Sequence, residues 1–533
     1  MKARVLLVNP SHPESAGYFA PTMHLGLRYI AARLRQDGAV VKLLDGDAVP
    51  LSDAAYDAAL ADTAPHVVGF TATHLTLPLV YRMASRCRER LPQAITVIGG
   101  HHATFADRGI LERCPAIDVV VRGEGEETMA ELVDRVSGGS FPQGVAGTTT
   151  RRGSTIVREA PRNPLVNLDD LPPPARDDLD QMLKAPRAPA IGVLTSRGCP
   201  NACAFCSTPA FARASGAPAW RARSETAVAA EMAQLASHTG TRARLFFSDD
   251  NFIGPAPEQY PRLERLAEAL ERSCPGLRFE ADCRSDALAA MPDALLRRLI
   301  RAGLDSVYLG LEAIDPAGLR QLGKGVTPRR NLMALKKARR AGLAAFRAGF
   351  ILFHPDTSLE ALPLNLKFLW RYGLTTYWSV SQRLKLFPGT AMASRLQEEG
   401  RFKPSLDHTN VYDYVFRDPR VGRMAASMGT LAERDEFRSS PAWVDFLMNL
   451  ERSLSALNMD AGARRLRLVR RGMQGELHRL AMRACDLARA GWDEAAFSRL
   501  AERAAAGLRA RADAAIASLD QLARLTGSGA IGG

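Results

Sequence analysis

Three cysteines in one short stretch are the residues of this sequence with the clearest chemistry. Cys199, Cys203 and Cys206 stand in "TSRGCPNACAFCSTP", residues 195–209, separated by three and then two residues. Thiolates bind zinc or iron–sulfur clusters, but a closed zinc site needs a fourth ligand, and no histidine or cysteine follows nearby. A four-iron cluster held by three thiolates keeps one iron open. The spacing therefore predicts a cluster with a free position where a substrate binds and is reduced.

The five remaining cysteines are scattered along the chain, at Cys87, Cys114, Cys274, Cys283 and Cys485. This distribution argues against a disulfide framework and indicates a metal or redox site in a reducing compartment. We expect these five side chains to be ordinary buried thiols.

Length and hydropathy define the class of protein. A chain of 533 residues is expected to form about three domains, and no apolar run approaches the roughly 20 residues that cross a bilayer. The N-terminal run "VLLV" stops at Asn9 and Pro10, which is typical of a first strand and not of a secretory signal. We therefore expect a soluble, cytoplasmic protein without a membrane span.

The net charge of +13 raises the possibility of an anionic partner. The C-terminal third contributes Arg-rich stretches such as "ARRLRLVRR" at 463–471, where arginines alternate with Leu and Val at helical spacing. We interpret these as solvated faces of amphipathic helices and expect no nucleic-acid partner, with an RNA or lipid patch as the alternative.

Residues 1–140 alternate short Val/Ile/Leu runs with amphipathic segments. This pattern predicts a parallel, doubly wound α/β domain with helices on both faces of the sheet. Ligands of such sheets bind beyond the carboxyl ends of the strands. The candidate binding residues in the loops at these ends are Asn9, Thr71, Thr73, His74, Gly99, Gly100, His101, Gly123 and Glu124.

The rest of the chain divides into three parts. Residues 141–188 are Pro-rich and predict a linker or strap. Residues 189–390 contain six strand patterns, from "IGVLTS" to "TTYWSVSQ", separated by amphipathic helices, which predicts a partial (β/α)6 barrel, similar to a TIM barrel with an open side. Residues 391–533 lose the strand pattern and predict a mainly helical C-terminal domain.

The cysteine loop, with Phe205 just before its last cysteine, resembles the signature of radical S-adenosylmethionine (SAM) enzymes. Other segments, such as "FFSDDNF", "DCRSD", "YLGLEA", "GFILFHPDT" and "LKLFPGT", fall at successive strand ends as in that superfamily. The resemblance implies that the three cysteines are catalytic and hold a [4Fe-4S] cluster whose open iron binds SAM. SAM is then cleaved to methionine and a 5'-deoxyadenosyl radical.

The same resemblance implies the SAM contacts. Phe205 belongs to this site, Asp249, Asp250 and Glu312 hydrogen-bond the ribose or amino group, and Arg284 pairs with the carboxylate. The alternative is that Glu312 and Arg284 form a structural ion pair of the barrel. The chain departs from many relatives at "HPDT", residues 354–357, where a glycine often follows the proline and adenine contacts are expected.

A doubly wound domain ahead of a radical SAM barrel resembles the cobalamin (B12)-dependent radical SAM family, of the class B methylase type. "VIGGHHAT" and "VVRGEGEET" carry this resemblance, which implies a flavodoxin-like, Rossmann-type domain with the cobalamin tail along Gly99 and Gly100. The chain lacks the D-x-H-x-x-G motif by which other cobalamin proteins supply an axial histidine, so we expect cobalamin to bind with its base displaced and without such a histidine on cobalt. The alternative is that His12 or His74, on loops that could face the corrin, is a cobalt ligand. The alternative for this domain is a plain nucleotide-binding or substrate-docking module.

The leading functional hypothesis is a C-methyltransferase that acts on an unactivated carbon of a small-molecule biosynthetic intermediate. In it the adenosyl radical removes a hydrogen atom and methylcobalamin supplies the methyl group. A cyclase, oxidoreductase or rearrangement enzyme using the same cofactors is the second reading, and a non-catalytic cobalamin or redox sensor is the third. Expected partners are an anionic small molecule and an electron donor such as flavodoxin or ferredoxin. Candidate substrate-selecting residues are Trp378, Arg383, Tyr412 and Tyr414.

Overall fold

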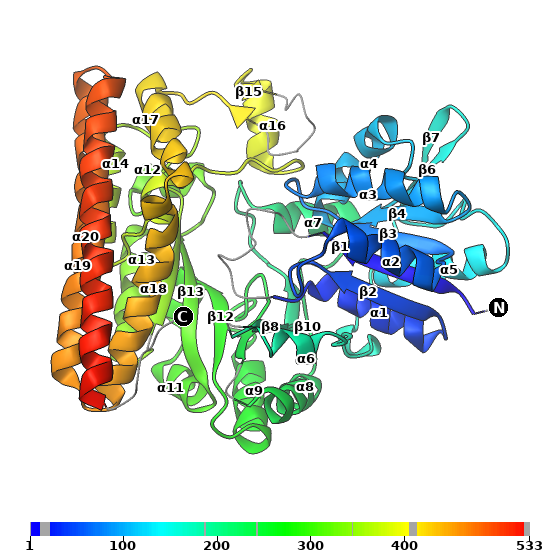
Figure 1. The fold of residues 1–533 in the computed structure, drawn as a ribbon, viewed down its shortest axis with the longest axis horizontal. Coiled ribbons are helices and arrows are strands. Elements are labelled where there is room, and N and C mark those ends of the chain that lie inside the picture. The colour runs from blue at the N-terminus through cyan, green and yellow to red at the C-terminus, as the bar shows by residue number, and fades with distance from the viewer. Residues whose placement is uncertain are drawn as a thin grey trace.

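The computed structural model describes residues 2–10, 22–185, 188–240, 243–343, 345–403 and 413–526. Figure 1 shows an N-terminal α/β region at one end, a second sheet in the middle, and a set of long helices at the opposite end. No helix among the described residues is both long and apolar enough to cross a membrane.

The N-terminal sheet has five parallel strands in the order β2-β1-β3-β4-β5. They are β1 (Arg4–Asn9), β2 (Val40–Asp45), β3 (Val67–Thr71), β4 (Ile95–Gly99) and β5 (Val119–Val121). Helices α1 (Leu25–Gln36) and α5 (Glu126–Ser137) cover one face, while α2 (Asp53–Thr63), α3 (Leu77–Arg90) and α4 (His101–Arg113) cover the other. This confirms the predicted doubly wound, flavodoxin-like domain, whose strand order reverses between β1 and β3.

Two further strands extend this sheet from a segment that the prolines led us to predict as linker. Strands β6 (Thr148–Arg152) and β7 (Thr155–Arg158) form an antiparallel hairpin beside β5. The hairpin turns at Gly153, which has a φ of 59°, a backbone conformation that suits glycine. The β-branched run "TTT" and this turn outweigh the nearby prolines, so part of the segment predicted as linker joins the N-terminal sheet.

The rest of the strap runs along the N-terminal domain. It contains the short helices η2 (Leu168–Asp170) and α6 (Leu179–Met182). The guanidinium of Arg28, which is fully buried, lies 2.7 Å from Asp178 of the strap and 2.8 Å from Asp45. This ion pair fastens the strap to α1 and to the end of β2.

The central sheet has five parallel strands in the order β14-β13-β12-β11-β8. They are β8 (Ala190–Val193), β11 (Arg244–Phe247), β12 (Phe279–Arg284), β13 (Leu304–Glu312) and β14 (Ala345–Phe350). Its helices are α8 (Glu225–Thr239), α9 (Tyr260–Ser273), α10 (Ser285–Ala290), α11 (Asp293–Arg301), α12 (Pro316–Gln321), α13 (Pro328–Arg340) and α14 (Ala361–Arg371). A small antiparallel pair, β9 (Ser196–Gly198) and β10 (Trp220–Ala222), flanks the cysteine stretch together with α7 (Ser207–Ser215).

The prediction of a sixth strand in this sheet is wrong. Most of "TTYWSVSQ" forms helix α15 (Tyr377–Ser381), and only a single bridge between Phe353 and Arg383 follows it. The helix begins with a capping box in which Thr376 accepts from the Ser379 amide and Ser379 accepts from the Thr376 amide. These two local hydrogen bonds outweigh the β propensity of the Thr, Tyr and Val residues.

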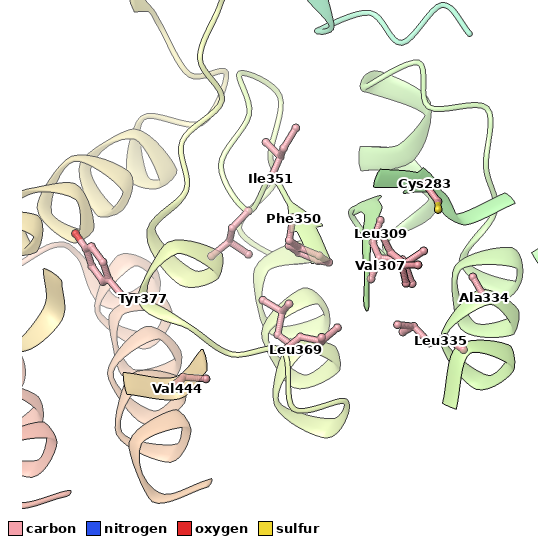
Figure 2. Close-up of a cluster of buried hydrophobic side chains, with 14 of the residues drawn as sticks. Cys283, Val307, Leu309, Ala334, Leu335, Phe350, Ile351, Leu369, Tyr377 and Val444 are labelled. Atoms are coloured by element: carbon pink, nitrogen blue, oxygen red, sulfur yellow. The ribbon is translucent and has the colours of Figure 1, made fainter. Parts of the chain in front are cut away.

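The C-terminal region is helical, as predicted. After α16 (Ala391–Glu398) and the pair β15 (Phe402–Lys403) and β16 (Asp413–Tyr414) come α17 (Pro419–Thr430), η3 (Leu431–Glu433), α18 (Asp435–Ala456), α19 (Asp460–Ala490) and α20 (Glu494–Thr526). Figure 2 shows Tyr377 of α15, Val444 of α18, Leu369 of α14 and Phe350 of β14 as members of the same cluster of buried hydrophobic side chains. The helices and the central sheet therefore share one hydrophobic core.

Candidate active site

A cavity of about 690 Å³ lies where the N-terminal sheet meets the cysteine-bearing loop. One wall consists of loops after the N-terminal strands, and the other comes from residues 194–221 with Asp250, Phe387 and Pro388. Gly198, directly before Cys199, and Ser207, directly after Cys206, both line it. The cavity therefore extends from the carboxyl ends of the N-terminal strands to the cysteine loop.

Glycines open this cavity on the side of the N-terminal sheet. Gly69 lies inside β3 and lines the cavity, and a Cβ added there would sit 2.8 Å from Cδ2 of Leu7 and 3.5 Å from Cε of Met129. Gly100 has a φ of 102°, and its added Cβ would lie 3.0 Å from the Thr71 hydroxyl. We call the part of the cavity lined by Gly69, Gly99 and Gly100 the slot; a larger side chain at Gly69 would displace Leu7 or Met129 and narrow it. Gly69 was missed, although a glycine inside a strand signals close approach of another group.

Eight of the nine candidate loop residues line the cavity: Thr71, Thr73, His74, Gly99, Gly100, His101, Gly123 and Glu124. Asn9 is not among the lining residues. Its amide donates to Asp45 at 2.8 Å and to Asp47 at 2.9 Å, so it organises the end of β1. His74 lies with its ring 5.9 Å from that of Phe387, and His101 stacks on Phe211 at 4.1 Å, so both histidines contact the opposite wall. His12 lies outside the described residues.

Ion pairs join the two walls. Arg197 lies 2.6 Å from Glu126 and 3.4 Å from Glu124, and Arg221 also pairs with Glu124. Burial alone would raise the pKa of Glu124, but the two arginines outweigh it and lower that pKa. The lowered pKa keeps Glu124 ionised and paired with the two arginines. We therefore infer that Glu124 belongs to the contact between the two domains.

The three cysteines are free and partly exposed on the loop after β9. The Asn201 amide donates to Cys199 Sγ at 3.6 Å, and the Arg284 guanidinium donates to Cys203 Sγ at 3.2 Å. Burial raises the pKa of the Cys206 thiol. The other five cysteines are buried, as predicted. Among the described residues, no group of three or more His, Cys, Asp and Glu side chains is arranged to hold a metal ion, so the loop is not a preformed single-metal site.

Asp249 and Asp250 have different roles. Asp249 is buried, and its carboxylate accepts from the Thr195 amide at 2.7 Å and from the Ser196 hydroxyl at 2.8 Å. Asp250 is exposed to the cavity and accepts from the Gly198 amide at 3.1 Å and the Thr208 hydroxyl at 2.8 Å. Asp250 thereby links the two ends of the cysteine loop. Asp249, in contrast, bonds groups of Thr195 and Ser196 that are buried inside the protein.

Arg284 and Glu312 lie close to the cysteine loop but do not pair with each other. Arg284 forms an ion pair with Asp286 at 3.0 Å and donates to the Lys324 carbonyl at 2.7 Å. Glu312 has a φ of 65° and lies 3.1 Å from the Lys324 ammonium group. A Cβ on Gly310 would meet both members of that pair at 2.8 Å, so the glycine makes room for it. Lys324, in "LGKGV", is a functional candidate that the sequence patterns did not single out.

Three polar residues form a row across neighbouring strands of the central sheet. Asp282 of β12 is in register with Tyr308 of β13, which is in register with Arg347 of β14. All three side chains are exposed on one face of the sheet. Although the side chain remains accessible, desolvation by the surrounding protein raises the pKa of Asp282 to about 6, with Arg347 opposing the shift and nearby carboxylates adding to it. The row was missed because each residue looks like an ordinary exposed strand position.

The departure at "HPDT" has a structural explanation. The Asp356 carboxylate is almost fully buried and pairs with Arg395 at 2.5 Å, Arg401 at 2.6 Å and Arg417 at 3.1 Å. Burial would raise the pKa of Asp356, but the arginines lower it to about 2. The aspartate therefore joins α16 and the strand pair β15–β16 to the sheet.

Of the candidate substrate-selecting residues, Trp378 is exposed on α15, and Arg383 stacks on Tyr414 at 4.4 Å while pairing with Asp413. Tyr412 lies outside the described residues. The phenol of Tyr414 donates to the Leu384 carbonyl, so this ring serves packing.

The site fits the cofactors that the residues imply. Three free thiols on one loop leave a fourth position open to another ligand, which suits a four-iron cluster. The glycine-lined slot provides a narrow path along the N-terminal sheet for an extended ligand. The structure thus combines an α/β domain that carries such a slot with a parallel-sheet domain that carries a three-cysteine loop. This combination is the one expected of an enzyme class with two cofactors, a corrinoid in the first domain and SAM at a cluster in the second.

Comparison with known proteins places the chain within this class. A model of the B12 binding domain matches residues 18–133, and a model of the Radical SAM superfamily matches residues 193–369. The chain is 32% identical over 346 residues to an uncharacterized methyltransferase of Pyrococcus horikoshii, covering 64% of this chain and 72% of that protein. The chain belongs to the cobalamin-dependent radical SAM enzymes, whose cofactors are a [4Fe-4S] cluster, SAM and cobalamin.

Further relatives have different reactions in their names. An anaerobic magnesium-protoporphyrin IX monomethyl ester cyclase of Synechocystis is 29% identical, and the hopanoid C-3 methylase of Methylococcus capsulatus is 28% identical. They align with 60% and 64% of this chain, which spans 63% of each relative, less than two thirds of their length. The solved structure of the cobalamin-dependent SAM radical enzyme OxsB with aqua-cobalamin covers 90% of this chain and 72% of its own, with a TM-score of 0.75 at 19% identity, which shows a shared fold.

Proposed function

We propose that this enzyme is a C-methyltransferase that acts on an unactivated carbon of a small-molecule biosynthetic intermediate. The observation that carries the proposal is the single cavity whose walls come from both domains and which reaches the two ends of the cysteine loop. A reaction that removes a hydrogen atom and then adds a methyl group needs both cofactors within reach of the same carbon.

When bound, SAM at the cluster supplies the radical that removes hydrogen, and cobalamin supplies the methyl group. In this proposal Cys199, Cys203 and Cys206 hold the cluster, and Asp250 fixes the geometry of their loop through Gly198 and Thr208. The glycines at positions 69, 99 and 100 leave room for the corrinoid along the N-terminal sheet.

The remaining SAM candidates have distinct parts in the proposal. Glu312 and Lys324 present paired charges near the sheet end, which suit the amino and carboxylate groups of SAM. Arg284 donates to a thiol ligand, and hydrogen bonding to a ligand sulfur tunes a cluster's potential. Asp249 acts through the backbone of Thr195 and is a positioning residue.

Asp282, Tyr308 and Arg347 are the proposed substrate contacts. Arg347 already bonds Glu280 at 2.8 Å, and Arg244 also pairs with Glu280, so the cations on this face are neutralised. Within the described part of the chain, the Asp282 carboxylate makes no hydrogen bond or ion pair, and only its backbone is bonded. This arrangement favours a substrate that donates hydrogen bonds through hydroxyl or amino groups over the anionic substrate that the net charge suggested.

The second candidate is a cyclase-type reaction, supported by the 29% identity to the protoporphyrin ester cyclase. The two candidates differ in the fate of SAM. Every cycle of a methyltransferase converts one SAM to S-adenosylhomocysteine as its methyl donor is renewed, whereas a cyclase need not form this product.

The test uses the full-length enzyme, reconstituted anaerobically with iron, sulfide and hydroxocobalamin. It is incubated with methyl-deuterated SAM and titanium citrate, and the products are measured by mass spectrometry. We expect up to one S-adenosylhomocysteine per bound cobalamin, since no methyl acceptor other than cobalamin is present, and 5'-deoxyadenosine that disappears in Cys203→Ala. Formation of 5'-deoxyadenosine without any S-adenosylhomocysteine would favour the cyclase, and absence of both would reject the proposal.

A further inference from the structure

The segment 316–343 is the most one-sidedly charged part of the central domain. It contains eight basic residues and no acidic residue: Arg320, Lys324, Arg329, Arg330, Lys336, Lys337, Arg339 and Arg340. It comprises α12, the turn that follows, and α13. A concentration of one charge over so few residues is a strong source of long-range attraction for an oppositely charged partner.

Most of these charges are exposed. Lys324 pairs with Glu312, and Lys337 lies 3.1 Å from Asp293, so two of the eight are neutralised within the protein. In the described structure, Arg320, Arg329, Arg330, Lys336 and Arg340 are exposed and form no ion pair. These five charges are therefore available to an acidic partner.

The exposed face of α13 also contains an apolar residue. Met333 is 47% exposed and lies one helical turn from Arg329, Arg330 and Lys336. The opposite face of the helix, with Ala334, Leu335 and Ala338, is buried in the core. Methionine and arginine are both enriched in protein–protein interfaces, so an exposed Met333 among arginines and lysines favours a protein partner over a nucleic acid.

The turn between α12 and α13 lies against the cysteine loop. The Ala204 amide donates to the Leu322 carbonyl at 2.9 Å, and a Cβ on Gly323 would lie 3.0 Å from that amide nitrogen. Gly323 and Gly325 are exposed. Figure 1 shows α12 and α13 on the side of the central sheet that lies away from the N-terminal domain, where they overlap the C-terminal helices in this view.

A chain of hydrogen bonds connects this turn to a cysteine sulfur. The Lys324 carbonyl accepts from Arg284 at 2.7 Å, and the same guanidinium donates to Cys203 Sγ at 3.2 Å. The backbone of the exposed turn is therefore one side chain away from a cluster ligand. Because electron transfer weakens steeply with distance, this turn is a favourable entry point for an electron.

We infer that α12, the 322–327 turn and the exposed face of α13 form the docking surface for a small acidic one-electron carrier protein. The inference rests on the proposed function, which needs a reductant from outside the chain. The carrier would be oxidised by one electron, which a cluster held by Cys199, Cys203 and Cys206 would receive, and which the cleavage of SAM to methionine and the 5'-deoxyadenosyl radical would consume.

The first test measures binding and does not depend on turnover. Full-length protein is titrated with oxidised flavodoxin by isothermal calorimetry at low and at physiological salt. We expect the affinity to fall with salt and the triple variant Arg320→Glu/Arg329→Glu/Arg330→Glu to bind at least tenfold more weakly at low salt. The control Arg464→Glu/Arg499→Glu/Arg503→Glu reverses three exposed charges on α19 and α20 and should stay within about twofold of wild type. Equal losses in both triples, or no loss in the first, would overturn the inference.

The second test separates the docking surface from the chemistry. With reduced flavodoxin as donor, the first triple should form 5'-deoxyadenosine at least tenfold more slowly, but with titanium citrate it should match wild type. Absence of product with titanium citrate even in wild type would reject the proposed function and leave the binding result to stand alone. If charge reversal unfolds the protein, the neutral Arg→Gln triple replaces it. Loss of poly(U) binding without loss of flavodoxin binding would make this an RNA surface and overturn the assignment.

Discussion

Asp356 is a single residue on which several elements depend. Its buried carboxylate faces Arg395, Arg401 and Arg417, which come from α16 and from the segments beside β15 and β16. The pKa of about 2 lies below the ordinary value of 3.8, so the ionised form is favoured in the folded state. Its contribution to stability is complete above about pH 4 and is lost as the pH falls towards 2.

We predict that Asp356→Asn lowers the free energy of unfolding by about 2 kcal/mol at pH 7, because the arginines lose the charge that they surround. Urea unfolding followed by fluorescence measures this loss. Asp486→Asn removes an exposed partner of Arg489 on α19 and serves as the control, with an expected change below about 0.5 kcal/mol. Similar effects for the two variants would show that burial of Asp356 has no energetic weight.

Asp282 should show the opposite pH dependence. Its folded pKa of about 6 is above the ordinary 3.8, so ionisation costs stability in the folded protein as the pH rises from about 4 to about 6. The melting temperature of Asp282→Asn relative to wild type should therefore increase over this range and stay constant above it. Asp62→Asn, at an exposed carboxylate 3.5 Å from Lys42, should show a small difference that does not vary in this way. A flat profile for Asp282→Asn would contradict the pKa assignment.

At this scale the sequence predicted residue types better than their partners. The three thiols, eight of nine cavity residues and the buried state of the other cysteines all followed from motif and position. The pairing of Glu312 with Lys324, and of Arg284 with Asp286, did not, because it depends on how side chains orient at the end of the sheet and in the turn after α12, which residue type and spacing do not record.

Among the elements, β3 shows how a strand can prepare a binding site. Strands β1, β4 and β5 turn Leu7, Val97 and Val121 toward the cavity, whereas β3 presents Gly69. The absent side chain leaves the slot open at the point where the strand order reverses, which is where doubly wound sheets bind their ligands.

We predict that Gly69→Leu reduces cobalamin retention at least tenfold, because the new side chain fills the slot beside Leu7 and Met129. The absorbance of bound corrinoid after desalting measures retention, and circular dichroism checks the fold. Gly429→Leu is the matched control, since nothing lies within 4 Å of its Cβ position on α17. Normal retention by Gly69→Leu would move the corrinoid away from this face.

The two elements that the sequence misplaced have local causes. Helix α15 forms because Thr376 and Ser379 cap each other, and the β6–β7 hairpin forms because Gly153 allows its turn. In both places the local preference of one to three residues outweighed the preference predicted from the surrounding sequence. The remaining parallel strands were predictable because buried strands need nearly continuous Val, Ile and Leu.

For the whole molecule, the contact between the N-terminal and central domains is the decisive feature. Arg221 is largely buried, pairs with Glu124 across the cavity and donates to the Leu165 carbonyl of the strap. We predict that Arg221→Met lowers the free energy of unfolding by roughly 3 kcal/mol, because Glu124 loses a buried partner.

The double variant Arg221→Met/Glu124→Gln should recover part of that loss in urea unfolding, as expected for a coupled pair. Arg35→Met, which removes a half-exposed partner of Asp177, is the control and should change stability by less than about 1 kcal/mol. Additive effects of the Arg221 and Glu124 substitutions would show that the two domains do not rely on this pair.

A cavity built from two domains also makes the stability of the folded protein depend on the supply of its ligand. A ligand that binds only the folded, closed arrangement stabilises it by mass action, by about 2.7 kcal/mol when its free concentration is a hundred times its dissociation constant. In our proposal cobalamin fills this cavity and contacts both of its walls, so its binding would stabilise the folded protein as well as supply a cofactor. We therefore expect cells starved of cobalamin to lose this protein to degradation as well as its activity.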